Sequence, residues 1–346
     1  MRGPPNMHED FETGGDFSGN DAFGVGQETA GQRLDRFLAD HLGDMSRTHV
    51  QTLIDEGRVL VNGRAKKPSY RLEAGETVTV EIPAPPSPGV EAENIPLDIL
   101  YEDQDVAVVN KPAGMIVHPG AGADAGTLVA ALLYRFGARG LSTVGGPLRP
   151  GIVHRIDKGT SGALLIARTD MAHLKLVEDF RERRIEKTYV TLLHGKLKGE
   201  SGRIELPIAR DLRRRSRMTA RRREGREART DWRMRLRLSN FSLIEAGLHT
   251  GRTHQIRVHF SALGCPVVGD TVYGAPRQEK VGSKTLLALE RNFLHAARIA
   301  FMHPRSGKRM ECRAPLPPEL VSYIEGLGRA TSAAPGAIDA ALRGFL

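Results

Sequence analysis

The stretch GIVHRIDKGTSGALLIAR, residues 151–168, places Arg155 and Asp157 two positions apart, among apolar residues and just before a turn rich in Gly, Thr and Ser. If residues 152–157 form a strand, Arg155 and Asp157 share one face of it. His154 then points to the opposite face. We expect KGTSG to turn the chain and ALLIAR to return it as the partner strand. The pair would then project from the end of a rigid hairpin, where a side chain can face a cleft.

Two other segments carry polar side chains that we expect to share a site with Arg155 and Asp157. Residues 249–264, HTGRTHQIRVHFSALG, are typical of a loop that leads into a helix, with Arg257 beside the apolar stripe of that helix. In EKTYVTLLHG, which starts at Glu186, strand alternation places Lys187 and Tyr189 on a common face. An Arg-x-Asp pair by itself is ordinarily a structural salt bridge. The functional interpretation therefore depends on Arg257, Lys187 and Tyr189 as well as on the pair.

The composition predicts a folded, soluble protein. With 346 residues, of which 40% are hydrophobic, the chain can fill the core of one large domain and one small one. Its apolar runs, such as ALLIA at 163–167, are far shorter than the roughly 20 residues of a membrane span. Cys265 and Cys312 stand apart from each other, so neither a disulfide framework nor a zinc ribbon is indicated, and a cytoplasmic location is expected.

The net charge of +9 is concentrated in one segment. Residues 210–229, RDLRRRSRMTARRREGREAR, hold ten arginines and three acidic residues, an excess of seven positive charges. The alternative is a solvated loop, but arginine matches phosphate oxygens and stacks on flat rings, and Trp232 is close in sequence. We therefore expect this arginine-rich segment to contact a nucleic acid backbone.

Residues 32–82 form a compact unit in the sequence. Apolar spacing predicts a helix that includes Leu34 and a second helix that begins at Ser46 and ends at Gly57. RVLVNG and TVTVEI predict strands around an Asn-Gly hairpin turn. The opening RLD, the SR before the second helix, GRVLVNG and LEAGETV resemble the S4 domain, a small RNA-binding module. The resemblance implies that four basic residues face RNA: Arg33, Arg47, Lys66 and Lys67.

Composition changes along the chain predict five segments. Beyond the S4-like unit, strands alternate irregularly with short helices, which favours an α+β domain with a largely antiparallel mixed sheet over a doubly wound parallel sheet. The segments are a disordered lead-in at 1–30, the S4-like unit at 31–83, a Pro-rich linker at 84–93, the large domain at 94–326 and a loosely held tail at 327–346.

Five stretches of the large domain follow one another in a recognisable order. They are NKPAGMIVHP, GIVHRIDKGTSGALLIAR, EKTY, HTGRTHQIRVHFSALGCPVVGDTVYG and FLHAARIAFMHP. Together they resemble the RluA/RluD family of RNA pseudouridine synthases. That family usually has Leu in place of Ile156 and an acidic residue in place of Gly159, and neither difference removes a reactive group. The resemblance implies a pseudouridine synthase fold and the isomerisation of uridine to pseudouridine, with no cofactor and no metal.

The resemblance also assigns roles to site residues. Asp157 is the carboxylate that attacks the sugar or removes its proton, and Arg257 is its ion-pair partner. Burial in a cleft raises a carboxyl pKa above about 3.9, so we expect the cation to keep Asp157 ionised. Arg155 fills the gap left by a flipped base, while Tyr189 holds the detached uracil and assists removal of the C5 proton. The other implied substrate contacts are Leu294, which closes over the base, and His154.

The S4-like unit, the linker and the arginine-rich segment look most like those family members that modify a stem-loop of 23S large-subunit ribosomal RNA, a step of ribosome biogenesis. The substrate is free RNA or a pre-ribosomal particle. A monomer is expected, because RNA binding accounts for the exposed charge. The bases expected to clamp RNA in this segment are Arg213, Arg214, Arg215, Arg217, Arg221 and Arg222.

Other hypotheses are weaker. A glycosidase uses two carboxylates around the bond, whereas these motifs supply one carboxylate with cations and a tyrosine. An S4-linked methyltransferase needs a glycine-rich cofactor loop, and PGAGADAG at 119–126 has the wrong spacing for the dinucleotide fingerprint. A non-catalytic assembly factor that binds ribosomal RNA stays as the alternative, although such a protein has no need of Asp157. His254 and His259 do not share a helical face, so no metal site is expected.

Overall fold

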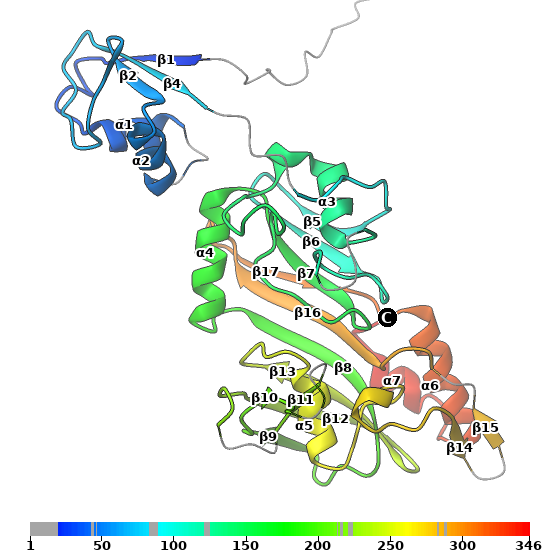
Figure 1. Cartoon of the computed structure of the whole chain (residues 1–346). Helices are drawn as coiled ribbons and strands as arrows, with labels where there is room; N and C mark the ends of the chain where they lie inside the picture. Colours follow the sequence, from blue (N-terminus) through cyan, green and yellow to red (C-terminus); the bar gives the residue numbers. More distant parts are fainter. Residues whose placement is uncertain are drawn as a thin grey trace, which may run out of the picture. The chain divides into compact units, whose positions relative to one another are not determined.

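The computed structural model (Figure 1) divides into two compact units, residues 1–86 and 87–346. This division falls within the segment predicted to be a linker. The structure describes residues 20–42, 45, 47–82, 89–120, 125–212, 214, 217–220, 224–281, 284–286 and 289–346.

The small unit combines two helices with a four-stranded antiparallel sheet of order β1-β4-β2-β3. The elements are β1 (Asn20–Gly24), α1 (Leu34–His41), α2 (Arg47–Asp55), β2 (Val59–Val61), β3 (Arg64–Ala65) and β4 (Thr77–Glu81). Leu34 and Phe37 of α1 are completely buried, as their helical spacing predicts. Asn62 and Gly63, with φ of 49° and 75°, form the predicted turn between β2 and β3. Ser46 lies outside the described residues.

The prediction of a disordered lead-in at 1–30 is wrong for its second part. Strand β1 pairs along its whole length with β4, and Val25 is buried in the core of the small unit. Gly24 and Gly26, on either side of Val25, made this short stretch look like a loop in the sequence. Residues 1–19 lie outside the described part of the chain.

A nine-stranded mixed sheet is the frame of the large unit. Its order is β5-β6-β7-β16-β8-β13-β12-β9, with β17 beside β16, and among the described strands only β7 and β16 pair in parallel. The predicted α+β fold with a largely antiparallel sheet is therefore confirmed. The strands are β5 (Asp98–Glu102), β6 (Val106–Lys111), β7 (Ser161–Ala167), β8 (Glu186–His194), β9 (Ser201–Ile204), β12 (Thr230–Leu238), β13 (Phe241–Leu248), β16 (Leu294–Met302) and β17 (Arg309–Arg313).

Helices pack on both faces of this sheet. Leu165 of β7 packs in one core with α4, which lies along β7 (Figure 1), whereas Leu164 packs in a second core with α3 and α5. The helices are α3 (Leu128–Phe136), α4 (Asp170–Arg181), α5 (Gln255–Ala262), α6 (Pro318–Ala330) and α7 (Ala337–Leu342), with short 3₁₀ turns at η1 (Ala138–Gly140) and η2 (Thr271–Tyr273). Two small hairpins pair β10 (Ala209–Arg210) with β11 (Met218–Thr219) and β14 (Glu279–Val281) with β15 (Lys284–Leu286).

The prediction of a loosely held tail at 327–346 is also wrong. Helix α6 runs through the expected boundary, and Leu327 and Leu342 are buried in a core that they share with β8. The small residues that suggested a loose tail instead allow close packing, because a Cβ on Gly328 would overlap the side chain of Ile338.

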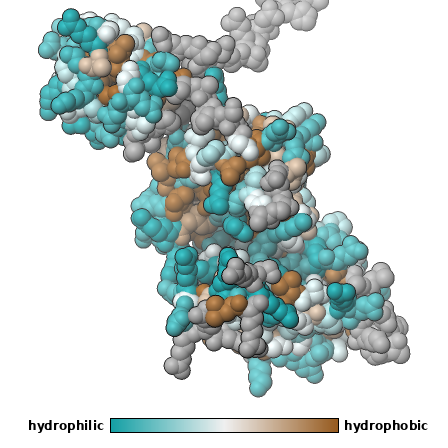
Figure 2. All heavy atoms as spheres, in the orientation of Figure 1, coloured by the Kyte–Doolittle hydropathy of each residue, from teal (hydrophilic) through white to brown (hydrophobic). Residues whose placement is uncertain are grey.

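The surface of the described part is mostly polar. Hydrophilic side chains cover much of the face seen in Figure 2, and hydrophobic ones gather in separate patches. None of the described helices is both long and apolar enough to cross a membrane. Cys265 and Cys312 are both buried and carry free thiols.

Candidate active site

The GIVHRID segment does not form the predicted strand. Ile152 makes a single bridge to β7, and residues 153–157 have no strand partner, because β7 pairs with β6 and β16 instead. Gly151 explains this departure. Its φ is 73°, and a Cβ at this position would lie only 2.9 Å from the side chain of Ile166. The segment therefore leaves the sheet and carries Asp157 into a cavity.

This cavity, of about 480 Å³, gathers the side chains predicted to act on the substrate. Its lining comes from the GIVHRID segment, the end of α4, β8, the end of β13, the loop before α5, α5 itself and the first residue of β16. A second hollow of about 710 Å³ shares Arg155, Asp157 and Arg257 with it. Asp157 thus lies where two hollows meet. The predicted residues that line the first cavity are His154, Arg155, Asp157, Tyr189, Arg257 and Leu294.

Arg257 meets Asp157, as the sequence predicts. Arg257 Nη1 donates a hydrogen bond to Asp157 Oδ2 at 3.1 Å, across 100 positions of sequence. The two side chains are only 11% and 18% exposed, so water screens the pair less than it would at the surface. On the other side of the carboxylate, His254 Nε2 lies 4.0 Å from Oδ1.

Asp270, which was not among the predicted site residues, fixes the position of Arg257. Arg257 Nε donates to Asp270 Oδ2 at 2.6 Å and Nη2 donates to Oδ1 at 3.0 Å, which is a bidentate pair. Burial opposes the charge on Arg257, but the bonds to Asp270 and Asp157 raise its pKa above the usual range. Asp270 belongs to the motif GDTVYG, and this motif is the signal that could have identified it.

Tyr189 presents its ring to the cavity from β8. The residue is 6% exposed, and burial, with a further contribution from the charge of Asp157, raises the pKa of its hydroxyl. The side chain is therefore a neutral phenol, better suited to holding a flat ring than to removing a proton by itself. Lys187, two residues earlier on the same face, also lines the cavity, and burial lowers its pKa to about 8.

A completely buried lysine supports the turn that follows Asp157. Lys111, the last residue of β6, donates from Nζ to the carbonyls of Pro112 at 2.7 Å and Met115 at 2.9 Å. The carbonyl of Lys158 lies 3.5 Å from the same nitrogen. Burial lowers the pKa of Lys111 to about 7. Lys111 lies in the motif NKPAGMIVHP, but the family resemblance implied no role for it.

The remaining predicted substrate contacts are held in different ways. Arg155 is exposed and makes no hydrogen bond or ion pair with any described residue. Leu294 is 4% exposed and lines the cavity from the start of β16. His154 Nε2 accepts the backbone N–H of Leu165 at 2.8 Å, and burial, then the charge of Lys187, lowers its pKa to about 3. Arg155 is thus free to reach a ligand, whereas the ring of His154 is engaged by β7.

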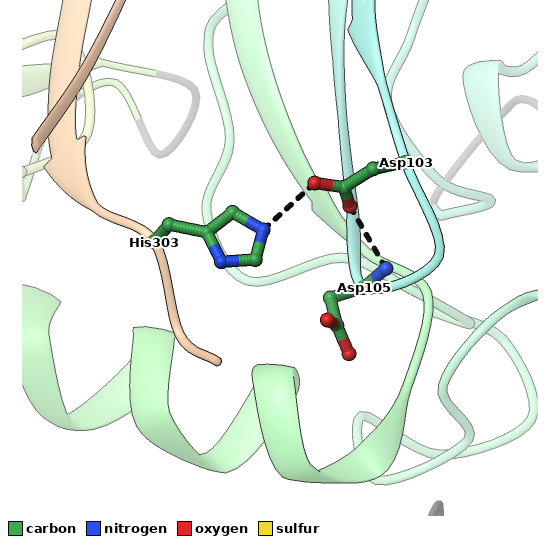
Figure 3. Close-up of side chains that lie close together, drawn as sticks. All are labelled: Asp103, Asp105 and His303. Carbon is green, nitrogen blue, oxygen red and sulfur yellow. Dashed lines mark hydrogen bonds and ion pairs between the residues drawn. The ribbon is translucent and has the colours of Figure 1, made fainter. Parts of the chain in front are cut away.

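One cluster in the described part of the chain has the donor types of a metal site: Asp103, Asp105 and His303 (Figure 3). Its donors already have partners. His303 Nε2 donates to Asp103 Oδ2 at 2.7 Å, and the backbone N–H of Asp105 donates to Asp103 Oδ1 at 2.9 Å. Arg305 makes two hydrogen bonds to Asp105, of 2.7 and 2.8 Å. Because Arg305 already neutralises Asp105, and Asp103 already accepts hydrogen bonds from His303 and the backbone, the cluster fits a structural network better than a cation site.

Arg33 and Arg47, predicted to face RNA, share the buried carboxylate of Asp35. Arg33 donates two hydrogen bonds to it and Arg47 donates one, each of 3.0 Å. The bond from Arg33 is the main reason why the pKa of Asp35 is well below its usual range. Arg47 of α2 therefore ties α2 to α1 through Asp35, whereas Arg33, which precedes α1, bonds Asp35 at the start of the same helix. Lys66 lies over an aromatic ring, and Lys67 is exposed.

The arginine-rich segment contains the β10–β11 hairpin. Arg214 is exposed, and Arg217 lies over the ring of Tyr273, 4.9 Å from its centre. The other predicted clamp residues lie outside the described residues: Arg213, Arg215, Arg221 and Arg222.

Comparisons with known proteins show which family the chain is similar to. The sequence profile of the family described as RNA pseudouridylate synthase matches residues 105–262, and that of the S4 domain matches residues 32–78. The chain is 44% identical over 301 residues to the uncharacterized RNA pseudouridine synthase YlyB of Bacillus subtilis (strain 168), covering 87% of this chain and 96% of that protein. It is 42% identical over 297 residues to the ribosomal large subunit pseudouridine synthase D of Zymomonas mobilis subsp. mobilis, covering 85% and 93%. Among solved structures, human RNA pseudouridylate synthase domain containing 1 is similar, with a TM-score of 0.50 and 29% identity over 69% of this chain and 96% of that one.

Proposed function

The chain belongs to the RNA pseudouridine synthases, and from this premise we propose that it isomerises uridines of large-subunit ribosomal RNA with Asp157 as the reacting carboxylate. The reaction breaks the bond between ribose C1′ and uracil N1 and joins C1′ to C5. C5 loses a proton and N1 gains one, so electrons balance without an oxidant or a reductant.

The ion pair between Asp157 and Arg257 is the observation that carries this proposal. An ionised carboxylate can attack C1′, or remove a proton from the sugar, and later leave. The bidentate bonds from Arg257 to Asp270 keep the cation in place beside Asp157. Because the pair is mostly buried, its electrostatic support of the anion is stronger than on an open surface.

The substrate uridine must leave its stack to reach Asp157, at a cost of a few kcal/mol. Arg155 is exposed, lines both hollows and is free to occupy the space that the base vacates. Tyr189 and Leu294 offer a flat ring and an apolar side chain to the detached uracil within the cavity. Since Tyr189 is a neutral phenol, it can take the C5 proton only while it passes its own proton on.

The choice of RNA is supported by the relatives and by charge. The relative from Zymomonas mobilis is named a ribosomal large subunit enzyme, and the S4 domain of the present chain supplies a second RNA-binding unit. Ten arginines in residues 210–229 suit contact with phosphates. We therefore propose a stem-loop of large-subunit ribosomal RNA as the substrate.

The test compares transcripts of large-subunit and small-subunit ribosomal RNA. Each RNA is incubated with the protein and with Asp157→Asn, digested to nucleosides and analysed for pseudouridine. Asp98→Asn is the matched control, because Asp98 is an exposed carboxylate on β5. We expect pseudouridine in the large-subunit RNA with the protein and the control, and none with Asp157→Asn. Equal product from Asp157→Asn would contradict the role of Asp157. RNA binding without product, in a pre-ribosomal particle as well, would favour a non-catalytic assembly factor.

A further inference from the structure

His254 directs its ring at the carboxylate oxygen that Arg257 leaves unbonded. The residue precedes α5 and has φ of 57° and ψ of 24°, a left-handed conformation that is uncommon outside glycine. Its Nε2 lies 4.0 Å from Asp157 Oδ1, while Arg257, three residues later, donates to Oδ2. The first turn of α5 and the residue before it therefore face both oxygens of Asp157.

The hydroxyl of Tyr273 is the hydrogen-bond partner of one ring nitrogen of His254. The hydroxyl of Tyr273 lies 2.8 Å from His254 Nδ1 and accepts the backbone N–H of Met218 at 2.9 Å. Its own proton has one acceptor among the described residues, which is His254 Nδ1. When Tyr273 donates this proton to Nδ1, the ring proton of His254 is on Nε2 and points toward Asp157. Burial lowers the pKa of His254, which favours this neutral form.

The same tyrosine joins the arginine-rich segment to α5. Met218 begins β11, so the hydrogen bond to Tyr273 comes from the hairpin of that segment. The ring of Tyr273 has Arg217 of the segment at 4.9 Å and Arg257 of α5 at 5.0 Å from its centre. Tyr273 is 3% exposed and packs with Val258 of α5, so its position is well defined.

We propose that Met218, Tyr273 and His254 form a positioning relay through which the backbone of the arginine-rich segment orients the carboxylate of Asp157. This inference rests on the proposed function and deepens it. A separation of 4.0 Å is too long for a hydrogen bond, so the Nε2–H dipole of His254 acts on the anion electrostatically and favours one rotation of it. His254 is thus a positioning residue, and the segment contributes to chemistry as well as to RNA binding.

The relay is tested first by rates. Tyr273→Phe keeps the ring between the two arginines and removes only the hydroxyl. His254→Asn tolerates the left-handed backbone and keeps a polar group near Nδ1, whereas His254→Gln places an amide near Nε2. We expect Tyr273→Phe to lower the single-turnover rate on saturating RNA about three- to tenfold, with an unchanged RNA dissociation constant. His254→Asn should be at least as slow, and His254→Gln should recover part of the rate.

The second measurement needs no RNA. The ¹⁵N shifts of the His254 ring report its tautomer, and we expect protonated Nε2 in the protein and a mixture of tautomers in Tyr273→Phe. Three outcomes would reject the relay. The first is that the tautomers are as expected but Tyr273→Phe has an unchanged single-turnover rate. The others are that Tyr273→Phe changes only RNA affinity, or that His254→Gln is no faster than His254→Asn. If the unaltered protein forms no pseudouridine, the proposed function fails. The relay is then judged from the ¹⁵N shifts alone, and it is rejected if Tyr273→Phe leaves the tautomer of His254 unchanged.

Discussion

The guanidinium of Arg257 is clamped by Asp270 through two hydrogen bonds, of 2.6 and 3.0 Å. Because the guanidinium is planar, this clamp sets the direction of its third nitrogen, Nη1, which points to Asp157 at 3.1 Å. Asp270 is 3% exposed and does not line either hollow around Asp157. The geometry of the proposed reacting carboxylate therefore depends on a second carboxylate behind it.

Replacing Asp270 should slow the chemistry without preventing RNA binding. Hydrogen bonds to charged groups contribute about 1.5 to 3 kcal/mol, so Asp270→Asn should lower the single-turnover rate by at least about tenfold. Rapid-quench kinetics on saturating RNA measures this rate, and a filter-binding assay measures the dissociation constant. Asp98→Asn is again the exposed control. A rate equal to that of the unaltered protein would show that Asp157 does not need the clamp.

Lys111 should make the stability depend on pH. Its pKa is lowered by burial from 10.5 to about 7, so between these values the unfolded chain binds more protons than the folded one. The free energy of unfolding therefore rises with pH in this window through Lys111. We expect the stability advantage of the unaltered protein over Lys111→Met to grow between pH 7 and about 10, as measured by urea unfolding.

Lys198→Met is the control for this experiment, because Lys198 is exposed. Its stability difference from the unaltered protein should stay constant over the same pH range. A constant difference for Lys111→Met as well would mean that Lys111 keeps its charge in the folded state.

Asp35 should stabilise the helix pair of the small unit. Its carboxylate is fully buried and accepts hydrogen bonds from Arg33, Arg47 and Gln51. Asp35→Asn removes the charge that these donors require, so the amides of α1 should exchange hydrogen at least about tenfold faster at neutral pH. Since the folded pKa of Asp35 is lowered, this stabilisation is lost as the pH falls below about 4. Asp40→Asn, on the exposed face of α1, should leave exchange unchanged, and equal exchange in the Asp35 variant would remove the stabilising role.

The arginine-rich segment should act mainly on RNA affinity through its exposed side chains. Arg210 and Arg214 are both exposed, and neither touches Tyr273 in the described structure. Arg210→Gln with Arg214→Gln should weaken RNA binding and lower the slope of log affinity against log salt by roughly 0.7 per lost single-strand phosphate contact. The single-turnover rate on saturating RNA should change much less. A large loss of rate with unchanged affinity would contradict this division of roles.

Local signals in the sequence predicted much of the fold. The spacing of Leu34 and Phe37 predicted α1, and the Asn-Gly pair predicted the turn between β2 and β3. The motif around Arg257 predicted its contact with Asp157, because the family resemblance supplied a long-range pairing that periodicity cannot supply. In each case the information is either local or carried by a recognisable motif.

The errors come from contacts that local patterns do not contain. The apolar run before Asp157 has the composition of a strand, but the backbone at Gly151 turns it away from β7. The clamp by Asp270 depends on how the chain after α5 folds back, and no spacing rule predicts this. The small residues of 327–346 favour a loose tail, whereas its burial depends on packing against β8, which is distant in sequence.

The most direct test of the central claim uses large-subunit ribosomal RNA that carries tritium at uracil C5. Forming pseudouridine releases this tritium to water, because C5 becomes the carbon that joins the sugar. We predict that the unaltered protein releases tritium, that the released amount equals the pseudouridine formed, and that Asp157→Asn releases none while still binding the RNA. Tritium release by Asp157→Asn at the unaltered rate would contradict the assignment of Asp157 as the reacting carboxylate.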